Sequence, residues 1–122
     1  MRRYRLAAAA QSDIVQLLAY TQRSFGVAAR QRYQRLLLTA LRDVAAEPES
    51  IGSAARPELG EQVRSYHLRH SRDRAANADG FVRRPRHLLL FRWTQPELID
   101  VARVLHDAME IERHLPADDR ND

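Results

Sequence analysis

Two segments in the first half of the chain carry apolar residues at helical spacing. In the first segment, three- and four-residue steps put four apolar residues on one face of a helix: Ile14, Leu17, Leu18 and Phe25. Similar steps place on one face of the second segment Tyr33, Leu37, Ala40, Leu41 and Val44. Gly26 supplies a stop for the first helix and Pro48 for the second. The tight turn between the two helices predicts an antiparallel hairpin with facing apolar stripes.

The second half of the chain shows strand-like patterns instead. The clearest are two apolar runs, residues 86–93 and 98–107, which the turn signal of residues 94–97 joins into a hairpin. Residues 63–70 are a weaker strand candidate, and residues 4–6 predict a short edge strand near the start of the chain. The intervening stretches, residues 49–62 and 71–85, predict loops, and we expect the second to be long and mobile.

This order of elements predicts an α+β fold. An N-terminal strand precedes a helical hairpin, which packs on a small, mostly antiparallel sheet, and a short C-terminal helix follows over residues 108–115. We expect one domain over residues 1–116 and a disordered tail over residues 117–122. Residues 88–91 are apolar at both the odd and the even positions, which predicts a central strand covered on both faces. Because the terminal helix is too short to cover the second face, we expect a protein partner there.

Composition narrows the cellular setting and the available chemistry. The chain has 122 residues and no cysteine, which excludes disulfides and thiol chemistry and favours a reducing cytoplasm. No apolar run is long enough to cross a bilayer, so we expect no membrane association. All 20 basic residues are arginine and the formal net charge is +4, which favours an anionic partner and excludes a lysine general base.

Several short motifs, in this order and spacing, resemble the ParE branch of the RelE/ParE toxin superfamily. They are Tyr4-Arg5-Leu6 before an Ala-rich helix start, Val63-Arg64-Ser65-Tyr66, Leu89-Leu90-Phe91-Arg92 and Val104-Leu105-His106. The likeness covers roughly residues 3–114. It implies a cytoplasmic type II toxin that traps DNA gyrase on cleaved DNA, needs no cofactor, and is silenced by a ParD-like antitoxin in a toxin–antitoxin hetero-oligomer.

RelE-type relatives cleave messenger RNA, and some residues of this chain are candidates for the same chemistry. Metal-free cleavage needs a base, an acid and cations at the phosphate. The candidates are Arg64, Arg103 and His106. The alternative is that Arg103 and His106 finish a strand and pair with Asp100 or Asp107, and we favour this structural interpretation because no clear acid–base pair is present.

The two histidines of an HxxH spacing, His67 and His70, suggest a metal site at first sight. On a strand, however, residues three apart point to opposite faces, and no carboxylate pattern supports coordination. We therefore expect no metal and no cofactor.

A cluster of arginines flanks residues 71–85 and is the leading candidate for partner binding. The predicted partner-binding residues are Arg69, Arg83, Arg84, Arg86, Arg92 and Trp93. These arginines could contact nucleic-acid phosphates, belong to a solvated loop without a partner, or bind an acidic antitoxin tail. Since no aromatic ladder accompanies them, protein docking is favoured over direct nucleic-acid binding, and we expect no sequence-specific DNA recognition. Phe91 and Trp93 are expected on opposite sides of their strand, one in the core and one facing a partner.

Three functional hypotheses follow. The leading one is a ParE-like toxin that inhibits gyrase by binding. The second is a RelE-type messenger RNA endonuclease, either ribosome-dependent or free. The third is a non-toxic relative kept as an interaction module.

Overall fold

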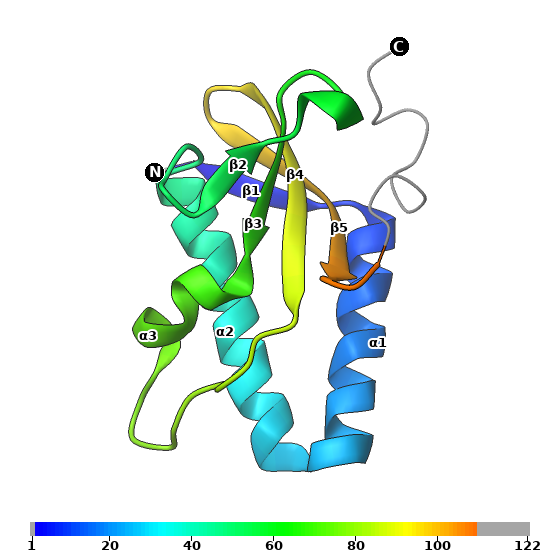
Figure 1. Cartoon of the computed structure of the whole chain (residues 1–122), viewed down its shortest axis with the longest axis vertical. Helices are drawn as coiled ribbons and strands as arrows, with labels where there is room; N and C mark the ends of the chain where they lie inside the picture. The colour runs from blue at the N-terminus through cyan, green and yellow to red at the C-terminus, as the bar shows by residue number, and fades with distance from the viewer. Residues whose placement is uncertain (1, 110–122) are drawn as a thin grey trace.

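A computed structural model describes residues 2–109 and confirms the predicted α+β class (Figure 1). Within these residues the strands form one sheet in the order β1-β5-β4-β3-β2. The strands are β1 (Arg3–Leu6), β2 (Ser53–Ala55), β3 (Val63–His67), β4 (His87–Gln95) and β5 (Leu98–His106). All neighbouring strands are antiparallel except β1, which runs parallel to β5 at one edge.

The predicted helical hairpin is present as α1 (Ala8–Phe25) and α2 (Val27–Ala46). The two helices meet at Gly26, whose φ of 93° is unfavourable for any residue with a side chain. All five predicted stripe residues of α2 are buried. In α1 the prediction is wrong for Phe25, which is 70% exposed, because the hairpin turn extends beyond the end of the sheet (Figure 1).

The sheet buries apolar side chains on both faces. One face of the sheet packs against α1 and α2 and is here called the helix face. Its side chains in the main core are Tyr66, Leu89, Phe91, Ile99, Val101 and Val104. The opposite face, here called the second face, holds a smaller cluster of Leu59, Val63, Leu90, Ala102 and Leu105. The prediction of a central strand buried on both sides is therefore confirmed for β4.

Three expectations about the loops are corrected. The strand predicted over residues 63–70 ends at His67, where the ring nitrogen Nδ1 accepts the Arg69 N–H and a 3-10 turn, η2 (Leu68–Ser71), begins. Residues 49–62 contain β2 and a second 3-10 turn, η1 (Pro57–Leu59). The connection expected to be irregular over residues 71–85 includes a one-turn helix, α3 (Arg72–Ala75), and a bridged turn over residues 77–80. These short elements show no clear periodic pattern in the sequence.

The predicted C-terminal helix falls almost wholly outside the described residues. Ala108 and Met109 lie in a turn and a bend after β5, and residues 110–115 are beyond the described range, as is the predicted tail of residues 117–122. The domain boundary at residue 116 stays a prediction. Among residues 2–109, neither long helix has the length and hydropathy needed to cross a membrane.

Candidate functional site

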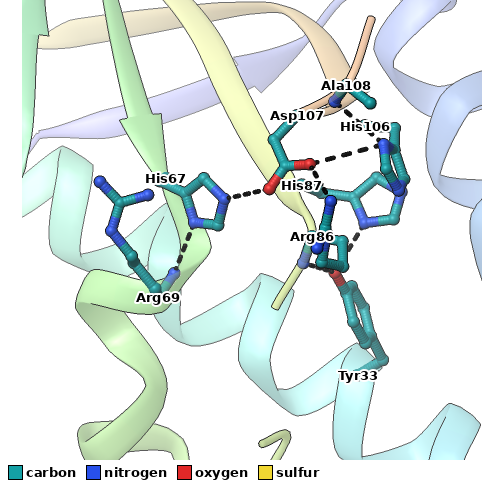
Figure 2. Close-up of polar contacts among 8 residues, drawn as sticks. All are labelled: Tyr33, His67, Arg69, Arg86, His87, His106, Asp107 and Ala108. Atoms are coloured by element: carbon teal, nitrogen blue, oxygen red, sulfur yellow. Dashed lines mark hydrogen bonds and ion pairs between the residues drawn. The ribbon is translucent and has the colours of Figure 1, made fainter. Parts of the chain in front are cut away.

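Three strand ends meet at one end of the sheet and bring together a cluster of polar side chains (Figure 2). β3 ends at His67, β4 begins at His87, and β5 ends at His106. Antiparallel pairing places these ends side by side, because His87 is opposite His106 in the register. The histidine cluster, as used below, consists of Tyr33, His67, Arg86, His87, His106 and Asp107.

Asp107 is the centre of charge in the histidine cluster. One carboxylate oxygen accepts a hydrogen bond from Nε2 of His67 at 3.0 Å, and the other lies 3.1 Å from Nη2 of Arg86 and 3.6 Å from Nδ1 of His106. The hydrogen bond from His67, together with the positive charge of Arg86, lowers the pKa of Asp107. Asp107 therefore stays ionised and links all three strand ends (Figure 2).

Tyr33 and His87 form the less exposed half of the cluster. The Tyr33 hydroxyl accepts the Arg86 backbone N–H at 3.2 Å and lies 2.6 Å from Nδ1 of His87. Burial lowers the pKa of His87 to about 4, with a further contribution from His106, and burial raises the pKa of Tyr33 to about 12. Both groups are consequently neutral at pH 7, so the tyrosine hydroxyl donates to the unprotonated Nδ1 of His87.

The hydrogen bonds of the cluster decide what chemistry it can perform. Both ring nitrogens of His67 are occupied, since Nδ1 accepts the Arg69 N–H and Nε2 donates to Asp107. Nδ1 of His106 accepts the Ala108 N–H at 3.1 Å, which leaves Nε2 as the nitrogen of this ring that could exchange a proton with a ligand. The cluster therefore contains one candidate acid–base group, His106, and its other side chains link the ends of the strands.

The three residues considered for RNA cleavage lie in separate neighbourhoods. Nε of Arg64 donates to the Pro48 carbonyl at 3.1 Å and to Oγ of Ser53 at 2.7 Å, beside β2. Arg103 forms a bidentate ion pair with Asp13 of α1, at 2.7 and 2.8 Å. His106 belongs to the histidine cluster. The structure therefore does not bring these three side chains together.

The partner of Arg103 differs from the carboxylates expected from the sequence. Asp13 takes that place, and it also accepts the backbone N–H of Val104 at 2.9 Å. β1 pairs with β5 only as far as Val101, so Asp13 of α1 satisfies a backbone donor on the β5 edge that no strand reaches. The pair holds the pKa of Arg103 above its usual value and fastens α1 to the sheet. Of the other expected partners, Asp100 pairs with Arg5 and Asp107 lies near His106.

Two cavities lie away from the histidine cluster. The first, of about 450 Å³, is formed by the second face, with Val63, Leu90 and Ala102 in its lining and Arg5, Arg92 and Asp100 among its polar groups. The second, of about 480 Å³, lies by the segment from Ala55 to Arg64 and includes Trp93 in its lining. Both volumes fall in the range of ordinary ligand pockets, about 300–1,000 Å³.

A comparison with protein families assigns the fold. Residues 4–111 match the family model described as the ParE toxin of the type II toxin–antitoxin system, parDE. The chain belongs to this family. The resemblance seen in the short motifs is thereby confirmed, and this ParE-family protein is the toxin of a type II toxin–antitoxin system, with an antitoxin as its partner. A comparison with curated proteins gives no match.

The predicted partner-binding residues of this ParE-family toxin divide into two groups. Arg69, Arg83, Arg84 and Arg86 are exposed on or near the connection between α3 and β4. Arg92 and Trp93 are half-buried near the other end of β4, where each contributes to the lining of one cavity.

The expectation that Phe91 and Trp93 face opposite sides is wrong. They are two residues apart on β4, so both side chains point to the helix face. Phe91 is buried in the main core and Trp93 packs against that core, with the Arg2 guanidinium 5.0 Å from its ring centre. Trp93 is therefore partly a core residue.

Sequence reasoning missed four members of these polar sites in their observed roles, namely Asp13, Tyr33, His67 and His87, whereas Asp107 was expected as a carboxylate partner and lies beside His106. The histidines carried a usable signal, because each stands at the end of a strand and antiparallel strands bring alternate ends together. Asp13 carried none, since it lies 90 residues from Arg103. The HxxH pair is also placed differently from expectation, because His70 lies in η2 and not on a strand. Among residues 2–109, no group of three metal-ligating side chains is arranged to hold a metal ion.

Proposed function

We propose that this toxin acts by binding DNA gyrase in the bacterial cytoplasm and is neutralised by a ParD-like antitoxin. The supporting observation is that the three residues considered for RNA cleavage are held in three separate sets of intramolecular contacts. Together with membership of the ParE family, this arrangement favours a toxin that works by binding a protein.

The ion pair of Arg103 is the strongest part of this argument. RNA cleavage requires cations that face the scissile phosphate and stabilise its developing charge. Nε and Nη2 of the Arg103 guanidinium both donate to Asp13, and the pair is largely buried, with side-chain exposures of 19% and 13%. A cation held in this way serves the stability of the fold.

The cavity on the second face is our candidate for the antitoxin. Its floor is apolar and its polar groups include two arginines, which suits an aliphatic anchor flanked by a carboxylate. Thr94 lines this cavity and is exposed, whereas its exposed neighbour Gln95 is not in the lining. We expect Thr94→Glu to weaken rescue by the co-expressed antitoxin and Gln95→Glu to leave rescue intact. Equal rescue of both variants would remove the cavity from the antitoxin interface.

Controlled expression in bacteria tests the target. Growth arrest with a DNA-damage response and intact messenger RNA is the expected result, and purified toxin should inhibit supercoiling by gyrase in vitro. Arrest without either effect on gyrase would refute the proposal. No arrest at all would favour the non-toxic interaction module.

RelE-type messenger RNA cleavage is the second candidate, and one observation favours it. Nε2 of His106 has no hydrogen bond to any described residue, and Nδ1 of the same ring lies near the Asp107 carboxylate oxygen that Arg86 contacts. If the toxin is a nuclease, His106→Ala should abolish RNA cleavage in a translation extract while His70→Ala preserves it. Intact RNA with the wild-type toxin would eliminate this candidate.

A further inference from the structure

Positive charge is concentrated in two segments of the chain. Residues 14–42 contain five arginines and no aspartate or glutamate, and residues 68–87 contain six arginines and two aspartates. These segments together have a formal charge of +9, whereas the whole chain has +4, so the remaining residues are net acidic at −5. The two segments are therefore strongly basic, although the net charge of the whole chain is modest.

The two basic segments are adjacent in space. Arg35 of α2 donates from Nε to the Ala75 carbonyl at 2.7 Å and from Nη2 to the Gly80 carbonyl at 3.3 Å. The Tyr33 hydroxyl of the same helix accepts the Arg86 N–H. The hairpin turn and the connection between α3 and β4 project together beyond the end of the sheet (Figure 1). This end of the molecule, called the basic end below, carries the exposed residues Arg23, Arg83 and Arg84 and the half-buried residues Arg30 and Arg32.

The five arginines of the basic end are not neutralised by carboxylates of the described residues. None of them takes part in an ion pair within residues 2–109, although Arg30 donates to the neutral Gln22 side chain. Nearby, Asp73 is paired with Arg72 and Asp107 with Arg86 and His67. Asp79 is the remaining carboxylate of the connection.

We infer that the basic end binds the phosphate backbone of duplex DNA without reading its sequence. Guanidinium groups at the surface that no carboxylate neutralises can each pair with a phosphate and release condensed counterions. An acidic peptide would also need pockets for its apolar side chains, and the two cavities described above are lined by other elements. A rigid polyanion needs only a surface of spaced cations.

This inference goes beyond the proposed action on gyrase and does not depend on it. Binding to DNA would keep the toxin close to any protein that works on DNA. Because binding is measured without gyrase, its loss would leave the gyrase proposal standing, and a DNA-binding toxin that spares gyrase would refute only that proposal.

The test is fluorescence anisotropy of the purified, tag-free full chain with a labelled duplex of mixed sequence, about 20 base pairs long, between about 50 and 200 mM KCl. The test variant is Arg23→Gln/Arg83→Gln/Arg84→Gln, whose side chains are exposed and make no ion pair within residues 2–109. The matched control is Arg3→Gln/Arg5→Gln/Arg56→Gln, outside the basic end. Each triple variant lowers the formal net charge from +4 to +1, so the two variants have the same net charge and lose it at different places.

We expect the wild type to bind with an affinity that falls steeply with salt. Each lost phosphate contact reduces the logarithmic salt slope by about 0.9, so the test variant should lose up to about 3 from the slope and about tenfold or more in affinity near 100 mM salt. The control variant should remain within about twofold of the wild type on the same contact-counting argument. Circular dichroism establishes that both variants are folded.

Three results would overturn the inference. The first is no binding by the wild type at about 50 mM salt, where counterion release is most favourable. The second is equal weakening by the two triple variants, which would show that only net charge matters. The third is tighter binding of labelled polyglutamate than of DNA, which would assign the basic end to an acidic peptide.

Discussion

Loss of the Asp13 carboxylate should destabilise the toxin severely, although this residue lies on a helix and outside the apolar core. Asp13 accepts three hydrogen bonds, two from Arg103 and one from the Val104 backbone N–H. In Asp13→Ala, the N–H loses its acceptor, which costs about 1–3 kcal/mol, and a largely buried guanidinium loses its bidentate partner, which costs about 3–5 kcal/mol when burial is complete.

The expected loss is smaller than the sum of these ranges. Arg103 keeps 19% of its side-chain surface exposed and has a further interaction besides Asp13, so water and that interaction compensate in part. We expect the free energy of unfolding to fall by about 3 kcal/mol, which corresponds to about 10 °C in melting temperature for a domain of this size.

Urea unfolding followed by circular dichroism measures this loss. The matched control is Asp100→Ala, because the Arg5–Asp100 pair is more exposed, at 65% and 33%, and should contribute about 0–1 kcal/mol. In the Arg103→Ala background, Asp13→Ala should cost much less than in the wild type, since the two side chains interact directly. A loss below about 1 kcal/mol, or one equal to that of Asp100→Ala, would refute the assignment of this pair as the link between α1 and the sheet.

Three further predictions concern stability. Burial lowers the pKa of His87 to about 4 from its usual 6.5, so the unfolded chain binds more protons than the folded chain between these pH values, and stability should decrease as the pH falls through this window. His87→Gln should make the urea midpoint fall less steeply between pH 7 and pH 4.5. An unchanged slope would contradict the burial of a neutral His87. Gly52→Ala places a Cβ only 2.6 Å from Cγ of His70 and should cost about 1–3 kcal/mol, with partial recovery in Gly52→Ala/His70→Ala; a double variant no more stable than the single one would argue against the clash. Leu90→Ala should cost about 2–5 kcal/mol in thermal or urea unfolding, because Leu90 is fully buried on the second face. The control is Leu38→Ala, because Leu38 is 41% exposed. Similar losses in the two variants would show that the second face is not a core.

Elements with a long periodic pattern were predictable from the sequence. α1, α2 and the β4–β5 hairpin repeat an apolar position over many residues, so their local pattern is enough to identify them. The same reasoning missed β2, because three residues with two small alanines show no alternation. It also misjudged Phe25, since periodicity shows which side of a helix is apolar and not how far the neighbouring sheet extends.

The candidate sites were less predictable, because they depend on contacts between distant segments. A β-bulge in β5 illustrates the reason. Leu90 is opposite Arg103 and Phe91 is opposite Val101, so Ala102 is an extra residue that interrupts the alternation of faces. The bulge brings Val104 to the helix face, where strict alternation from Ile99 and Val101 would not place it, and its backbone N–H and the Arg103 side chain both donate to Asp13.

The sequence by itself determined the fold class, the helical hairpin, the central strand and the family, because apolar periodicity and short motifs are local properties. Tertiary structure alone decided that Arg103 is paired with Asp13, that three histidines share one end of the sheet, and that two arginine-rich segments form one basic end. Those features arise from strand register, a bulge and helix placement. They depend on distances in space, and residues far apart in the chain carry no local signal of them.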